Sequence, residues 1–283
     1  MTTARIGLAL GGGGARGIAH VPVIEAFDDL GIRPTAIAGT SIGAIFGAGH
    51  AAGLDGKALR EISQTTFADR NSVLARLWKL RPRKLGDLFG SPGIMQFDAL
   101  KVLEQFVGQH IPATFEELET PLTLIATDFY QCREVRLERG SLHHAVAASI
   151  AIPALFKPVT VDGRIMVDGG LVNPLPFDAL PPDIDIVVAC DVVGSPMPRK
   201  GRNLPGAGDA VFGATQILMQ SIVLEKLKNR QPDVLVKPDI SGFRVLDFMK
   251  TASILEAAEP MREMVKQRVG AAIEAYETGR QIA

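Results

Sequence analysis

The chain has 283 residues, of which 47% are hydrophobic and 22% are charged, and its formal net charge is −1. A chain of this length and hydrophobic content can bury a sizeable core, which excludes a disordered protein. The near-neutral charge argues against a nucleic-acid partner, since such a protein needs a basic surface. Cys132 and Cys190 have neither metal-binding nor disulfide spacing, which favours a reducing, cytoplasmic location.

Two segments share some features with targeting or membrane segments. The apolar run after Arg5 is too short for a signal peptide. Residues 34–54 carry no Asp, Glu, Lys or Arg and are long enough to span a bilayer. Their glycines leave too little apolar surface for insertion. We therefore expect no transmembrane helix.

The N-terminal part of the chain alternates between strand and helix patterns. Residues 5–10, which are apolar after Arg5, are typical of a buried strand. A glycine loop separates them from a helical pattern over residues 17–30. A second strand over residues 34–38 enters a glycine-rich turn, and another helix follows to about Ala52. This order predicts an α/β fold with a mainly parallel central sheet flanked by helices.

The remaining sequence extends this fold around one less regular segment. Residues from about 64 to 95 lack a clear period and contain a basic stretch, Arg70 to Lys84, around the only tryptophan, Trp78. No linker divides the chain, so we expect a single domain over residues 1–283 with a basic insertion at about 64–95 and a helical C-terminal part over 209–283. The further predicted elements are helix 98–107, strands 121–127 and 134–138, helix 142–149, strands 165–167 and 184–192, helix 209–230, strand 233–236 and helix 251–278.

The first motif is the glycine loop between the first strand and the first helix. Gly12, Gly14 and Gly17 fit G-x-G-x-x-G, the dinucleotide-binding pattern. That pattern requires an acidic residue at the end of the second strand, where this chain has none, and no Lys-Ser/Thr of a P-loop follows Gly17. The loop then offers backbone N–H groups at a helix N-terminus, which bind anions. A tight turn that serves only helix packing is the alternative.

The second motif, Gly39-Thr-Ser-Ile-Gly43, fits the nucleophile elbow G-x-S-x-G on a predicted strand-to-helix turn. Its glycines would allow a strained turn that exposes the oxygen of Ser41. The alternative is a glycine-rich helix start with Ser41 as N-cap. Under either interpretation Gly43, Gly47 and Ala51 mark a face of close helix packing.

The histidines do not supply an obvious base for Ser41. An α/β-hydrolase carries its triad in the order Ser, then Asp or Glu, then His. In this chain no histidine lies in the last 139 residues, so none follows a late acid such as Asp168. We expect His20 and His50 to brace the glycine loops. We expect His143 and His144 to be surface or packing residues.

Asp168 is the candidate base. It ends a predicted strand and precedes Gly169 and Gly170, and strand ends at the carboxyl edge of a parallel sheet are common places for sites. A carboxylate within hydrogen-bond reach of Ser41 could take its proton directly. Because such a base is weak, donors aimed at the developing oxyanion must lower much of the barrier. The alternative is an aspartate that only starts a Gly-Gly turn.

Together these motifs resemble the patatin-like phospholipase family, in particular its bacterial members and the catalytic domain of neuropathy target esterase. The glycine loop resembles the family's oxyanion loop, the Ser41 turn its nucleophile elbow, and Asp168-Gly-Gly170 its aspartate motif. Ser149 to Pro158 and Asn173 to Pro176 are similar to further family blocks. The matches follow the family's order over about the first 177 residues.

The resemblance implies a patatin-like domain of αβα layers that hydrolyses lipid acyl esters through a Ser–Asp dyad without histidine. Ser41 would be the nucleophile and Asp168 the base, and Arg16 would brace the loop. No metal or cofactor is implied, and the partner would be a lipid or another acyl ester. The oxyanion hole would be formed at Gly12, Gly13 and Gly14, and the further motif glycines are Gly17, Gly39, Gly43, Gly169 and Gly170.

Three further interpretations stay open. The Arg70 to Lys84 stretch fits a solvated basic loop best, but it also fits a cap over the site or a patch that meets anionic lipid and gives peripheral membrane contact. The apolar helix Val211 to Leu227 fits core packing better than a lipid contact or partner interface. For the whole chain, a regulatory or scaffold protein with weak catalysis is the alternative to an enzyme.

Overall fold

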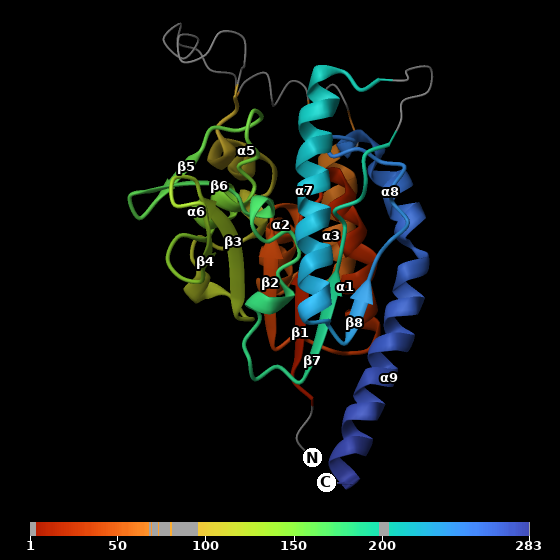
Figure 1. The fold of residues 1–283 in the computed structure, drawn as a ribbon. Helices are drawn as coiled ribbons and strands as arrows, with labels where there is room; N and C mark the ends of the chain where they lie inside the picture. The colour runs from red at the N-terminus through yellow and green to blue at the C-terminus, as the bar shows by residue number, and fades with distance from the viewer. Residues whose placement is uncertain are drawn as a thin grey trace, which may run out of the picture.

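The computed structural model describes residues 4–67, 69, 73, 80, 96–197 and 204–282. One eight-stranded sheet lies between helices (Figure 1). Its strand order is β5-β6-β3-β2-β1-β7-β8, with β4 paired to β3. The strands are β1 (Ile6–Leu10), β2 (Ala36–Thr40), β3 (Leu122–Asp128), β4 (Arg133–Leu137), β5 (Val159–Val161), β6 (Arg164–Asp168), β7 (Ile186–Cys190) and β8 (Val234–Val236).

Helices cover both faces of this sheet, so the fold has the expected αβα layers. The helices are α1 (His20–Asp29), α2 (Ile42–Ala51), α3 (Gly56–Phe67), α5 (Ala99–Phe106), α6 (Leu142–Ser149), α7 (Ala207–Asn229), α8 (Thr251–Ala258) and α9 (Pro260–Ile282). Helix α7 crosses the front of the sheet in Figure 1, and most other helices lie behind it. Short 3-10 turns span Gly14–Ala19, Gly108–His110, Phe115–Glu117, Gly169–Leu171, Phe177–Ala179 and Phe248–Lys250.

The side chains of the buried strands alternate between the two faces of the sheet and so divide the hydrophobic core into two clusters. In β1, Leu8 and Leu10 pack into the larger cluster beneath α1 and α2, whereas Ala9 packs into the smaller cluster beneath α7. Successive strand residues point to opposite faces of a sheet, so each inner strand contributes to both layers. These strands are buried at every position, as a parallel sheet covered on two sides requires.

Two strands meet end to end along one edge of β3. Thr40, the last residue of β2, pairs with Ile125, and Asp168, the last residue of β6, pairs with Ala126. Strand β4 occupies the other edge of β3 over the same residues. Strand β6 is antiparallel to β3, so Asp168 ends an antiparallel strand of this mainly parallel sheet. The reversed direction brings the carboxyl end of β6 against the carboxyl end of β2.

Helix α7 differs from our expectation of core packing. Several of its large apolar side chains are exposed, among them Val211, Leu218 and Leu224. By length and composition α7 is the one helix in the described part of the chain that could cross a membrane. Within the protein, 22% of its most apolar stretch is buried. Polar side chains of its inner face nevertheless hold it to the domain: Gln220 donates to the Gly194 carbonyl and Lys226 donates to Leu175.

Most predicted elements appear within a few residues of their expected bounds, and the exceptions are informative. Helix α3 and strand β5 were not predicted from the sequence. The first predicted helix begins as a 3-10 turn at Gly14, and the last divides at Glu259 and Pro260 into α8 and α9. Trp78 and nearly all of the Arg70 to Lys84 stretch lie outside the described residues.

Candidate active site

Ser41 occupies a strained turn between β2 and α2. Its backbone has φ 55° and ψ −122°, a region that non-glycine residues rarely adopt. A side chain at Gly43 would overlap the Leu10 carbonyl, so the tight approach of α2 to β1 requires glycine there. Although Ser41 precedes α2, its side chain makes no capping bond. This geometry is that of a nucleophile elbow rather than of a simple helix cap.

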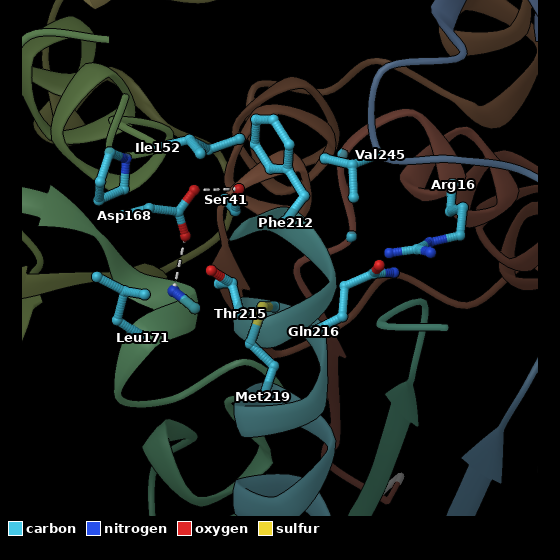
Figure 2. A pocket seen from close by; sticks show the side chains of 14 residues that line it. Arg16, Ser41, Ile152, Asp168, Leu171, Phe212, Thr215, Gln216, Met219 and Val245 are labelled. Carbon is cyan, nitrogen blue, oxygen red and sulfur yellow. Dashed lines mark hydrogen bonds between the residues drawn. The ribbon is translucent and has the colours of Figure 1, made fainter. Parts of the chain in front are cut away.

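Ser41 and Asp168 are in direct contact across the junction of β2 and β6. The Ser41 hydroxyl donates to Oδ2 of Asp168 at 2.6 Å, while Oδ1 accepts the Gly170 N–H at 2.7 Å (Figure 2). Both side chains are buried, at 4% and 6% exposure. One carboxylate oxygen of Asp168 therefore accepts a hydrogen bond from the Gly-Gly turn, and the other accepts one from Ser41. The hydrogen bond from Gly170 shows that Asp168 starts the Gly-Gly turn, and its role as a base stays a prediction.

Burial raises the pKa of the Asp168 carboxyl to about 6, although the hydrogen bonds from Ser41 and Gly170 lower it in part. The desolvated carboxylate is a stronger base than an exposed one, which suits proton abstraction from a hydroxyl.

A pH profile tests this role of Asp168. Because only the ionised carboxylate can accept the Ser41 proton, kcat/KM for an ester should rise with pH and level off above an apparent pKa of about 6. Well below that value the rate should fall about tenfold per pH unit. Initial rates on a soluble ester, measured over the range where the protein stays folded by circular dichroism, provide the profile. A flat profile between pH 5 and 7 would contradict it.

The glycine loop presents two free amides to the site. The N–H of Gly11 donates to Cys190 and that of Gly12 to Pro174, so these two are already used. The N–H groups of Gly13 and Gly14 have no acceptor among the described residues, and both glycines line a pocket with Ser41 and Asp168. The expectation that Gly12 also contributes an oxyanion donor is therefore wrong, because its hydrogen bond fixes the loop instead.

Gly14 is the loop position where glycine is required by conformation. Its φ is +61°, and a Cβ atom there would overlap the backbone carbonyl of Val245. That carbonyl accepts the N–H of Ala15 at 2.7 Å. The segment after β8 therefore packs directly on the loop and holds it. Of the other motif glycines, Gly17 lies against Ile42, Gly39 against Gly43, and Gly169 against Ile125.

Arg16 lies inside the protein, with 1% of its surface exposed. With the Gln216 amide oriented to face it, the amide oxygen accepts from Nη1 and Nη2 of Arg16 at 2.5 and 2.7 Å. Burial lowers the pKa of Arg16 to about 10, and the charge of Asp191 opposes this shift. The guanidinium thus joins the glycine loop to α7, a position consistent with the bracing role expected from the sequence.

The histidines stand outside the Ser41–Asp168 pair, since none of the five is hydrogen-bonded to either residue. His20 is fully buried, and burial lowers its pKa to about 4; its Nε2 lies 2.9 Å from the Gly11 carbonyl, so it braces the glycine loop as expected. His50 contacts the Leu54 carbonyl after α2 instead. His143 and His144 lie in the first turn of α6 and contact the Ile111 carbonyl and the Ser141 hydroxyl, as expected of packing or surface residues.

Sequence reasoning missed three supports of the site. The Ser149 hydroxyl accepts the N–H of Ser41 at 2.9 Å, which helps to hold the strained turn. The Thr127 hydroxyl donates to the backbone carbonyl of Asp168 at 2.8 Å. The Thr40 hydroxyl donates to the Asn173 carbonyl. Ser149 and Asn173 begin the two further blocks noted in the sequence, but neither block indicated a contact.

The site opens into two pockets that share Ser41 and Gly14. The smaller, of about 50 Å³, holds Asp168 and is bordered by Phe212, Thr215 and Met219 of α7 (Figure 2). The larger, of about 500 Å³, is almost wholly apolar and follows α2, α3 and α5. Among the described residues, no group of three or more His, Cys, Asp or Glu could hold a metal ion.

Comparison with known proteins shows the family of this chain. The family model for patatin-like phospholipase matches residues 8–181, which are more than half of the chain and include Gly13, Gly14, Ser41 and Asp168. The chain belongs to the patatin-like phospholipase family. An uncharacterized NTE family protein of Mycobacterium tuberculosis (strain ATCC 25618 / H37Rv) is 37% identical over 193 residues, which cover 68% of this chain and 50% of that protein.

Other relatives extend the match to the patatin-like chain's C-terminal part. A patatin-like phospholipase domain-containing protein of Caenorhabditis elegans is 31% identical over 90% of this chain, but the match covers only 20% of that protein. The chain spans about half the length of the curated bacterial relatives it matches. Among solved structures, VipD from Legionella pneumophila shares the fold with a TM-score of 0.51 and 14% identity, covering 94% of this chain and 67% of that one.

Proposed function

We propose that this patatin-like protein is a serine hydrolase of lipid acyl esters, of the phospholipase A, lysophospholipase or carboxylesterase type. The observation that carries the proposal is the 2.6 Å hydrogen bond between Asp168 and the serine of a strained elbow, beside two loop amides that have no acceptor among the described residues. A nucleophile, its base and its oxyanion donors are the groups that acyl transfer needs.

The reaction would proceed in two halves. Oγ of Ser41 attacks the ester carbonyl carbon while Asp168 takes the hydroxyl proton, and the N–H groups of Gly13 and Gly14 stabilise the oxyanion. The tetrahedral intermediate then expels the alcohol, which receives the proton from Asp168, and leaves an acyl group on Ser41. Water attacks this acyl-enzyme while Asp168 takes a proton from it, and Asp168 then passes that proton to Oγ of Ser41 as the fatty acid leaves.

The larger pocket suits the acyl chain of such a substrate. Ile42, Ile45 and Gly49 line it from one face of α2, so it extends about 12 Å along the helix from Ser41. Leu54 and Leu59 lie against Gly49 at that distance. Its volume of about 500 Å³ falls within the range of small-molecule sites, and its walls offer few polar partners. These features favour long apolar acyl groups over short or polar ones.

Chain-length dependence tests this use of the larger pocket. Each methylene moved from water into the pocket contributes about 0.8 kcal/mol, so kcat/KM should rise about fourfold per added methylene until the pocket is filled. Gly49→Leu would shorten the pocket and should lower kcat/KM only for the longer esters. A series of p-nitrophenyl esters measures both effects, and the short esters serve as the folding control. An identical loss for all chain lengths would contradict the assignment.

The proposal extends to the location of the protein and to its contact with membranes. A cytoplasmic location fits the two free cysteines, Cys132 exposed and Cys190 buried. Peripheral membrane contact through Arg70 to Lys84 stays a prediction, because that stretch falls almost wholly outside the described residues. No cofactor or nucleic-acid partner enters the mechanism. Fatty acid release from a panel of phospholipids and lysophospholipids, with Ser41→Ala as the blank, tests the activity and identifies the substrate.

A further inference from the structure

The outer face of α7 is apolar beside the candidate active site. From Ala207 to Leu224 the only charged residue is Asp209, and the side chains of Val211 and Leu218 are 57% and 64% exposed. Leu204, just before the helix, is 81% exposed. Soluble proteins seldom leave so many large apolar side chains together in water without a partner.

A second exposed apolar segment borders the same site. Leu246 and Met249 are 47% and 41% exposed, and both also line the larger pocket that reaches Ser41. Arg244 and Lys250 flank them, while Asp247 between them pairs with Lys250, so the segment carries a net positive charge. Exposed apolar side chains between basic residues are typical of surfaces that enter the interface of an anionic membrane.

The two segments border the same pocket of the active site. Phe212 of α7 and Val245 both line the pocket of Ser41 and Asp168, and Figure 2 shows their side chains close together on one side of it. Val211 and Leu246 are their immediate neighbours in the chain. Leu204, the first turns of α7 and residues 244–250 are here called the apolar rim of the site, and Leu204, Val211, Leu246 and Met249 are exposed members of it.

We propose that this apolar rim docks on the surface of a phospholipid bilayer that contains anionic lipids, an inference that rests on the proposed lipid hydrolase function. Leu246 and Met249 belong both to the exposed rim and to the pocket wall, so an acyl chain could pass from the bilayer to Ser41 without crossing water. The basic residues of the rim complement an anionic headgroup layer. A second copy of the chain would leave this continuity unexplained.

The proposal distinguishes two exposed apolar side chains of α7 by their position along the helix. Leu224 is 55% exposed, almost the same as Val211, but it lies 13 residues further on, about 20 Å along the helix axis. Interfacial side chains enter a bilayer to a depth of about 5–10 Å. Docking through the rim therefore buries Val211 and leaves Leu224 in water.

The test measures binding to vesicles of phosphatidylcholine with phosphatidylglycerol by co-sedimentation, in the Ser41→Ala background so that turnover plays no part. The double variant Leu204→Ser and Val211→Ser should weaken binding by at least about tenfold. The matched control Leu224→Ser should bind unchanged. In the background with Ser41 intact, both should hydrolyse a soluble short-chain ester at the normal rate. Equal losses in the double variant and the control, or no loss in the double variant, would overturn the proposal.

The charge of the rim gives an independent readout. Arg244→Gln should weaken binding to the anionic vesicles about fivefold, the change that about 1 kcal/mol per basic residue corresponds to, and should leave binding to pure phosphatidylcholine unaltered. If the rim variants change the molecular mass in solution instead of vesicle binding, the face joins two copies and the membrane assignment is wrong. Hydrolysis of soluble ester without vesicle binding defeats this proposal alone. Vesicle binding without hydrolysis defeats the proposed function alone.

Discussion

Replacing Ser41 by alanine should lower kcat for ester hydrolysis by about 10³-fold or more and leave the fold intact. The variant retains the loop amides and the apolar pocket but has no oxygen to form an acyl-enzyme, so only substrate binding and oxyanion stabilisation persist. The lost hydroxyl also removes a hydrogen bond to Asp168 without adding bulk at the strained turn. Steady-state rates on a soluble ester, with circular dichroism for the fold, measure the effect.

Ser221→Ala is the matched control for that experiment. Ser221 is exposed on α7, and its hydroxyl donates only to the Ile217 carbonyl one turn earlier. Its loss should leave kcat unchanged. If Ser41→Ala kept the wild-type rate, the nucleophile would have to be another residue, and the dyad would be wrong as well.

Replacing Asp168 by asparagine should lower kcat by about 10²- to 10⁴-fold, the usual contribution of a general base. The same change should make the protein more stable at neutral pH. Asparagine can still accept the Gly170 N–H through its oxygen, and its amide can donate to Ser41. The variant therefore loses the proton acceptor while the hydrogen bonds around it persist.

The sign of the stability change follows from the pKa of Asp168. Its folded value, about 6, lies above the ordinary 3.8, so the folded state disfavours the ionised form. This cost is absent below about pH 4, grows between pH 4 and 6, and is fully present above that range. Asparagine removes it, which should raise the free energy of unfolding at pH 7 by on the order of 1–3 kcal/mol.

Denaturant unfolding of wild type and Asp168→Asn at pH 4 and pH 7 tests this sign. The difference should appear only at pH 7. Asp183→Asn serves as control, because Asp183 is an exposed partner of Arg5 and surface pairs contribute little. A destabilised Asp168→Asn protein at pH 7 would mean that the carboxylate is needed to hold the site together.

Short sequence motifs predict much of the candidate active site. The glycines on either side of Ser41 and those after Asp168 encode turns whose geometry depends mainly on near neighbours in the chain, so a pattern of a few residues indicates them. The contact between Ser41 and Asp168 is of another kind. It depends on β2 and β6 meeting along β3 from opposite directions, and that register is set by strand pairing over more than 100 residues.

Two predictions were wrong for the same physical reason. A single sequence does not show which distant residues a group will hydrogen-bond to or pack against. Gly12 looks like its neighbours Gly13 and Gly14, but its N–H is taken by Pro174, which lies far along the chain. Helix α7 has apolar residues on all sides, so its sequence does not indicate which face is buried. In the structure the inner face of α7 lines the pocket of the candidate active site, and its outer face is exposed.

The most direct test of the central claim is the mass of the peptide that contains Ser41 after reaction with an alkyl fluorophosphonate. We expect one adduct on Ser41, no labelling of Ser41→Ala, and slow labelling of Asp168→Asn because its serine lacks a base. An adduct on any other residue, or equal labelling of wild type and Ser41→Ala, would show that the Ser41–Asp168 pair is not the catalytic centre.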